Sequence, residues 1–152
     1  MREVKTLGAD DARRGIAAVR AAAERRDAAV VVAIADAYGE LLALLRMDGA
    51  SPADIAPAIA KAYTAARLAQ PTRAIEAASR NLKTGFDLAG FADPRISGLV
   101  GGVPMDFQGD TVGAVGVSGA SPDTEEALAE AGIAAMQAPY APAQPDQDEA
   151  IP

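Results

Sequence analysis

The chain has 152 residues, a net charge of −7, and neither cysteine nor histidine. This length suits a single domain, and an apolar fraction of 50% is enough to form a core. The acidic balance argues against nucleic acid binding, which relies on clustered Lys and Arg. The missing residue types exclude disulfides, thiolate nucleophiles, zinc sites, Ser-His-Asp triads and histidine-ligated heme, and we expect no metal site.

The sequence contains no recognisable secretory signal and no run long enough to span a membrane. We therefore expect a cytoplasmic protein that binds neither membranes nor nucleic acid. We predict that residues 1–137 form one domain. Residues 138–152 are rich in Ala, Pro and Asp, and we interpret them as a tail that is disordered or exchanged between subunits.

In chain order, the patterns predict a helix, a hairpin, two helices, a second hairpin and a last helix. These elements occupy helix 10–26, strands 30–35 and 41–47, helices 54–68 and 72–82, strands 103–107 and 111–118, and helix 121–137. Residues 30–35 are continuously apolar, as in a central strand covered on both faces. Hairpins alternating with helices predict an α/β fold of the α+β type, with a mostly antiparallel sheet and helices packed on it.

Charged and phenolic residues lie around the first hairpin. They are Asp36, Tyr38 and Glu40 around the tight turn, Arg46 and Asp48 at the far end, and Lys61 on the following helix. Single charges of this kind usually form surface ion pairs. Alternatively, an Arg and a Lys in one pocket would favour a ligand that carries a carboxylate.

Glycines in the last predicted strand leave two interpretations open. Gly113, Gly116 and Gly119 are spaced as G-x-x-G-x-x-G, which matches neither the dinucleotide-binding fingerprint nor the P-loop. A glycine inside a strand indicates that either a helix or a ligand approaches closely.

Two loops flank this second hairpin, and each has two interpretations. The loop with Gly101, Gly102 and Pro104 is either a bend before an edge strand or a backbone rim that admits a flat ligand. The turn from Ser118 to Ser121 either exposes N–H groups to a carboxylate or phosphate, or is ordinary helix capping by Ser121.

Five blocks of residues follow one another in an order that is more informative than any single block. They are Asp36-Ala37-x-Gly39 with Leu41, Arg46-Met47-Asp48-Gly49, Lys61-Ala62-x-Thr64-Ala65, Gly101-Gly102-Val103-Pro104, and Val112-Gly113-Ala114-Val115-Gly116-Val117-Ser118-Gly119. Together they resemble the GlcG/HbpS family, which includes the C-terminal domain of PduO-type corrinoid adenosyltransferases. The resemblance covers about residues 10–137. It implies a sandwich with an antiparallel sheet of about five strands flanked by helices, symmetric homo-oligomers, and heme or a related tetrapyrrole as the ligand of some members.

Two positions depart from the family pattern. Many members carry a second Gly where this chain has Tyr38, and often a His where it has Glu40. A heme iron would therefore need a Tyr, Met or Lys as its axial ligand, and Tyr suits ferric heme best. The candidates are Tyr38, Tyr63, Met47, Met105 and Lys61.

The first hypothesis is a small-molecule-binding oligomer of the GlcG/HbpS type, with heme or another tetrapyrrole as ligand. Its predicted binding residues are Asp36, Asp48, Tyr63, Gly101, Gly102, Pro104, Gly116, Ser118 and Gly119. The alternative is a cofactor-independent isomerase, cyclase or lyase that acts on a small organic substrate, acidic or neutral. Its catalytic residues would be Tyr38, Glu40, Arg46 and Lys61, because a phenol near a carboxylate can act as an acid/base pair. A third hypothesis is an accessory protein that binds a protein partner.

Overall fold

A computed structural model describes residues 1–142 of the chain. Most of the predicted tail, residues 143–152, lies outside the described residues. The described beginning of that tail, Ala138–Tyr140, forms a 3-10 turn (η3) directly after the last helix. None of the helices within residues 1–142 is both long and apolar enough to cross a membrane.

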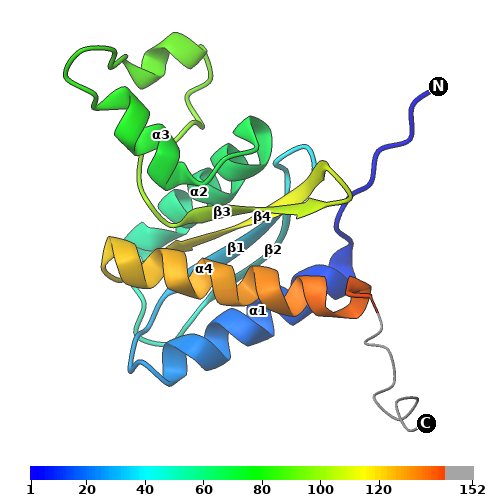
Figure 1. Cartoon of the computed structure of the whole chain (residues 1–152). Coiled ribbons are helices and arrows are strands. Elements are labelled where there is room, and N and C mark those ends of the chain that lie inside the picture. Colours follow the sequence, from blue (N-terminus) through cyan, green and yellow to red (C-terminus); the bar gives the residue numbers. More distant parts are fainter. Residues whose placement is uncertain (143–152) are drawn as a thin grey trace, which may run out of the picture.

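Four antiparallel strands form one sheet in the order β2-β1-β4-β3 (Figure 1). The strands are β1 (Val31–Asp36), β2 (Leu41–Arg46), β3 (Gly102–Phe107) and β4 (Asp110–Ser118). The two predicted hairpins are joined through β1 and β4, which occupy the centre of the sheet and are almost completely buried. The predicted fold class and the central strand are confirmed, with four strands where about five were expected.

Helices cover both faces of the sheet. α1 (Ala9–Glu24) and α4 (Pro122–Gln137) pack side by side on one face, and α2 (Ile55–Leu68) covers the other (Figure 1). The α1–α4 face buries the larger side chains, whereas small residues line the α2 face. A Cβ at Gly116 would lie 2.2 Å from the carbonyl oxygen of Ala58. Helix packing, one of the two interpretations of these glycines, is therefore what the structure shows at Gly116.

Both edge strands have features that suit the edge position. β3 contains Pro104, which pairs with Ala114 and is tolerated because an edge strand can lack one N–H donor. β2 pairs with β1 through a register shift at Ile34 and Ala35. Edge strands often carry such irregularities, which limit pairing with other chains.

The segment 72–99, which we call the arm, projects away from the sheet (Figure 1). It contains α3 (Thr72–Ser79) and the 3-10 turn η2 (Leu88–Phe91). Four of its apolar side chains are exposed: Leu82, Phe86, Phe91 and Leu99. α3 ends three residues before the predicted boundary, because the side chain of Asn81 accepts hydrogen bonds from the N–H groups of Lys83 and Thr84 and starts a turn.

Aspartates near the starts of α1 and α2 make different contacts. At the start of α1, Asp11 lies within the first turn and accepts a hydrogen bond from the N–H of Gly8 at 2.9 Å. Asp54 precedes α2 but makes no side-chain cap. Its carboxylate instead accepts a hydrogen bond from Ser118 Oγ at 2.9 Å, and this contact ties the start of α2 to the end of β4.

Candidate functional site

A polar cluster lies at the end of the sheet where β1 turns into β2. Tyr63, on α2, is 2% exposed, and its hydroxyl donates to Asp93 Oδ2 at 2.5 Å. Arg67 Nε and Arg95 Nη2 donate to the same hydroxyl oxygen at 3.0 and 2.8 Å. The guanidinium of Arg95 lies 3.9 Å from the centre of the Tyr63 ring, and it pairs with Glu40 at 3.1 Å. We call these five residues the turn-end cluster.

The turn-end cluster balances two guanidinium groups against two carboxylates. The hydrogen bond from Tyr63, followed by that from the backbone N–H of Arg95, lowers the pKa of Asp93. The hydrogen bond to Glu40 raises the pKa of Arg95. The side chains of Arg95 and Glu40 are 52% and 61% exposed, so their ion pair contributes little and can open easily. An opened pair would offer the planar guanidinium of Arg95 to a ligand carboxylate.

Two of the predicted site residues, Asp36 and Tyr38, form the turn itself. Asp36 Oδ1 accepts hydrogen bonds from the N–H groups of Tyr38 and Glu40, both at 2.9 Å, so this carboxylate holds the turn. Gly39 adopts φ +86°, and a Cβ there would lie 2.9 Å from the Tyr63 ring. The Tyr38 side chain is exposed, and its hydroxyl has no hydrogen-bond partner among residues 1–142.

Lys61 lies in a buried junction between α2, β4 and α4. Its side chain is 3% exposed, and Nζ pairs with Glu125 Oε2 at 2.7 Å and donates to the carbonyl oxygen of Val117 at 2.9 Å. The other carboxylate oxygen of Glu125 accepts hydrogen bonds from the N–H groups of Gly119 and Ala120 at 2.9 and 3.2 Å. The turn from Ser118 to Ser121 is one predicted binding site for a ligand anion. Two of its N–H groups instead bind a carboxylate of the chain itself.

The predicted ligand residues Gly101 and Gly102 lie against the same junction. Both are buried, and a Cβ at Gly102 would lie 2.4 Å from the carbonyl oxygen of Lys61. Gly101 adopts φ +125°, a conformation that L side chains rarely adopt. Ser118 is also buried and is engaged with Asp54. Gly101, Gly102 and Ser118 therefore allow the start of β3 and the end of β4 to pack closely against α2.

Strand β2 presents an exposed apolar surface on the α2 side of the sheet. Leu41 and Leu44 pair with Ala35 and Ala33, which face α2. Cross-strand partners project to the same side, but α2 lies over β1 and β4 and leaves these leucines 47% and 36% exposed. Arg46 follows on the same face at the far end of β2, and it has no ion pair among residues 1–142.

We call Leu41, Leu44 and Arg46 the β2 strip. It begins beside the turn-end cluster, because Glu40 directly precedes Leu41. From Leu41 to Arg46 the strand spans about 17 Å at its usual rise per residue. An arginine therefore lies at each end of an apolar surface: Arg95 at one end and Arg46 at the other.

The structure separates the residues of the predicted catalytic set. Tyr38 and Glu40 lie at one end of β2, Arg46 lies at the other end, and Lys61 is enclosed in its ion pair. Asp48 is exposed beyond Arg46. Tyr63 and Glu40 of the turn-end cluster are among the residues predicted from the sequence, whereas the three residues that contact them, Arg67, Asp93 and Arg95, are not. A helical i, i+4 spacing links Tyr63 to Arg67 and could have indicated that contact.

Comparisons with known proteins match almost the whole described chain. The sequence model of the family described as "Haem degrading protein HbpS-like" matches residues 7–134. Protein GlcG of Escherichia coli (strain K12) is 40% identical over 103 residues, which are 68% of this chain and 74% of GlcG. An uncharacterized 15.0 kDa protein of Citrobacter freundii is 32% identical over 131 residues, which are 86% of this chain and 92% of that protein.

Solved structures share the same fold. Klebsiella pneumoniae protein ORFY superimposes with a TM-score of 0.86 at 30% identity, covering 91% of this chain and 95% of ORFY. A double mutant of Streptomyces reticuli HbpS has a TM-score of 0.79 at 31% identity, with 88% and 89% coverage. A heme complex of PduOC has a TM-score of 0.79 at 25% identity, with 86% and 94% coverage. The extent of these matches confirms the resemblance found in the sequence, and the chain belongs to the HbpS-like family.

Proposed function

We propose that this protein binds a flat, largely apolar molecule that carries carboxylates, of the tetrapyrrole class, on the β2 strip and the turn-end cluster. The observation that carries the proposal is the exposed apolar surface of Leu41 and Leu44 between Arg95 and Arg46. Membership of the HbpS-like family and the heme complex of PduOC support the ligand class.

Each part of the surface has a counterpart in such a ligand. Leu41 and Leu44 are exposed without a covering helix, and covering them with a macrocycle gains about 25 cal/mol for each Å² of apolar surface removed from water. Arg46 can bind a ligand carboxylate directly, because it has no ion pair among residues 1–142. Arg95 becomes available when Glu40 is displaced, and a guanidinium binds a carboxylate through two parallel hydrogen bonds.

The five candidate axial ligands differ in their access to a heme iron. The Tyr63 hydroxyl is enclosed by three partners, Lys61 is ion-paired, and Met105 is 1% exposed. Met47 is packed partly against the core. Tyr38 is 54% exposed in the turn before β2, where its side chain borders the N-terminal segment. Of the five it is the most open to an iron, and a phenolate suits ferric iron. A bound heme would supply a redox-active iron, whereas the β2 strip contacts the macrocycle.

The enzymatic alternative requires Tyr38, Glu40, Arg46 and Lys61 to meet at one small substrate. Glu40 and Arg46 flank β2 at opposite ends, about 20 Å apart along the strand. Lys61 already has a buried carboxylate partner. One small substrate therefore does not reach these groups together within one chain, and we favour binding as the function.

Titration with hemin and with metal-free protoporphyrin IX tests this proposal. Binding is monitored by the absorbance of the porphyrin and by quenching of the protein's tyrosine fluorescence. We expect both to bind, with hemin the tighter because only hemin can use Tyr38. Leu44→Asp weakens both by roughly tenfold, since it removes about 1.5 kcal/mol of apolar contact. Tyr38→Phe weakens hemin binding and leaves protoporphyrin binding unchanged.

The matched control is Leu82→Asp, the same substitution at an exposed leucine of the arm. It should leave both affinities at the wild-type level. Absence of binding by both porphyrins would overturn the proposal. So would equal affinities of the Leu44→Asp and Leu82→Asp variants, because the β2 strip would then have no role.

A further inference from the structure

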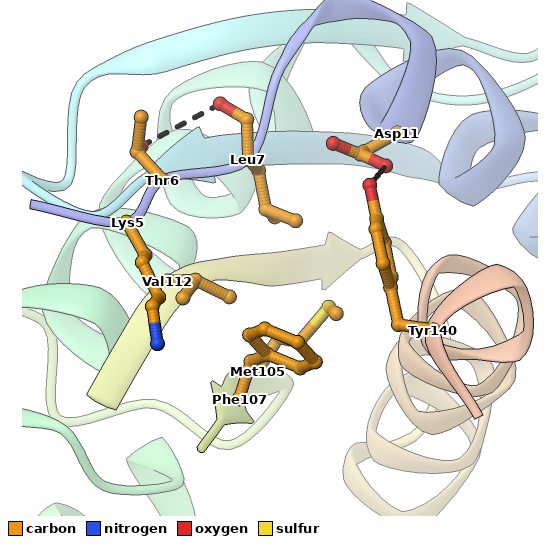
Figure 2. Close-up of a pocket in the computed structure, with 8 residues that line it drawn as sticks. All are labelled: Lys5, Thr6, Leu7, Asp11, Met105, Phe107, Val112 and Tyr140. Carbon is orange, nitrogen blue, oxygen red and sulfur yellow. Dashed lines mark hydrogen bonds between the residues drawn. The ribbon is translucent and has the colours of Figure 1, made fainter. Parts of the chain in front are cut away.

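A pocket of about 230 Å³ lies between the N-terminal segment, the β3–β4 hairpin and the end of α4 (Figure 2). Its deepest residues, Leu7, Met105 and Val112, belong to the core that α1 and α4 cover, so the pocket lies on the opposite face from α2. The N–H of Leu7 donates to the carbonyl oxygen of Val112 at 2.9 Å, which anchors the N-terminal segment to β4.

The floor of the pocket is apolar and well buried. Leu7, Met105 and Val112 are 4%, 1% and 4% exposed. The ring of Phe107 forms one side, and Tyr140 forms another, with the two ring centres 5.5 Å apart. Figure 2 shows these side chains around a central space, with Lys5 and Tyr140 on opposite sides. An apolar group of a ligand would therefore contact protein on several sides.

The acidic end of the pocket is already neutralised. Asp11 is 8% exposed, and it accepts hydrogen bonds from the Tyr140 hydroxyl at 2.7 Å and from the N–H of Gly8 at 2.9 Å. Arg14 also pairs with this carboxylate. The hydrogen bond to Asp11 raises the pKa of Tyr140, which keeps the phenol protonated as a donor. Asp11 is thus compensated and does not call for a cationic ligand.

The basic end is not neutralised in this way. Lys5 Nζ donates to the side-chain oxygen of Gln108 at 2.5 Å and lies 5.6 Å from the centre of the Phe107 ring. Both of these partners are uncharged, and Lys5 has no ion pair within residues 1–142. The positive charge at the mouth of the pocket therefore remains available to an anion.

We propose that this pocket binds a small apolar carboxylate, an arylacetate or a branched-chain acid. Its apolar part would lie on Leu7, Met105 and Val112, and its carboxylate would pair with Lys5. The size agrees, because an apolar cavity of about 150 Å³ holds benzene and this pocket is larger. The apolar floor of the site lies on the other face of the sheet from the β2 strip, so the β2 strip takes no part in it, although Lys5 and Tyr38 border one shared hollow.

The test compares three probes of similar shape: phenylacetate, phenylacetamide and 2-phenylethylamine. Methionine methyl groups labelled with ¹³C supply the readout by nuclear magnetic resonance. Phenylacetate should shift the methyl signal of Met105 in a saturable way. Met47 lines a different pocket at the far end of β2, so its methyl signal is the internal reference and should not move. The amide should bind more weakly than phenylacetate, and the amine most weakly.

Lys5→Gln removes the charge and keeps most of the side chain. It should weaken phenylacetate binding by up to about fivefold, as expected for an exposed ion pair, and leave phenylacetamide binding unchanged. Lys83→Gln, the same substitution at an exposed lysine of the arm, is the matched control. An unmoved Met105 signal at millimolar phenylacetate overturns the site. Equal binding of the amine, or equal effects of the two lysine substitutions, overturns the assignment of the ligand as an anion.

Discussion

Replacing Lys61 with Met would leave the carboxylate of Glu125 in the buried junction without its ion-pair partner. The two side chains are 3% and 8% exposed, and Nζ lies 2.7 Å from Oε2. Removing one partner of a buried pair costs about 3–5 kcal/mol, because the remaining charge stays desolvated. The N–H groups of Gly119 and Ala120 still stabilise Glu125, so we expect a loss near the lower end, about 3 kcal/mol.

Urea unfolding measures this loss. With a slope of about 2 kcal/mol per molar urea, the midpoint of Lys61→Met should fall by roughly 1.5 M. Adding Glu125→Gln should recover part of the stability, since no charge then remains buried. Arg73→Met is the control, because Arg73 pairs with Asp123 and Glu126 at the surface and its loss should lower the midpoint far less than Lys61→Met does. Equal midpoints for Lys61→Met and Arg73→Met, or a double variant as unstable as the sum of its parts, would refute the reasoning.

Two further substitutions test the α2 packing and the turn-end cluster. Gly116→Ala places a Cβ 2.2 Å from the carbonyl oxygen of Ala58 and should lower the free energy of unfolding by about 1–3 kcal/mol. Gly90→Ala, whose Cβ would have no atom within 4 Å, should stay within about 0.5 kcal/mol of wild type. Similar melting temperatures of the two variants would contradict this. The lowered pKa of Asp93 means that its carboxylate stabilises the fold above the ordinary aspartate pKa of about 3.9, and that this contribution is lost as the pH falls through the folded-state pKa. Asp93→Asn should therefore melt below wild type at pH 7 and approach it in acid, and a difference that does not change with pH would count against the cluster.

The sequence predicts the helices and strands well because each shows either a periodic pattern, as in α1, or a continuous apolar run bounded by turn residues, as in β1. The order of the strands in the sheet, by contrast, has no local signal in the sequence. Nothing local in β1 specifies that it pairs with β4, since that pairing depends on how α2 packs across both strands. Gly116 illustrates the limit, because a missing side chain suits a helix and a ligand equally well until the neighbour is known.

The candidate site is predicted only in part. Lys61 stands out in the sequence as a charge, but its burial depends on Glu125, which lies 64 residues later. Tyr63 is a ligand residue predicted from the sequence, whereas its contacts Asp93 and Arg95 come from a loop without periodicity, about thirty residues away along the chain. Contacts between such distant segments are set by the tertiary structure and leave no local pattern.

Ile75, on α3, is the one apolar side chain of the arm that is buried, and beyond it the arm is attached to the rest of the protein mainly by polar contacts. The N–H of Ser97 donates to Thr64 Oγ1 at 2.8 Å, and Phe86 packs edge-to-face on Phe91 within the arm itself. Because the arm buries little apolar surface after α3, we expect this part of it to open as a separate unit while the sheet stays intact. Opening would withdraw Arg95 from the turn-end cluster, and the apparent affinity for an anionic ligand would then scale with the fraction of molecules whose arm is closed.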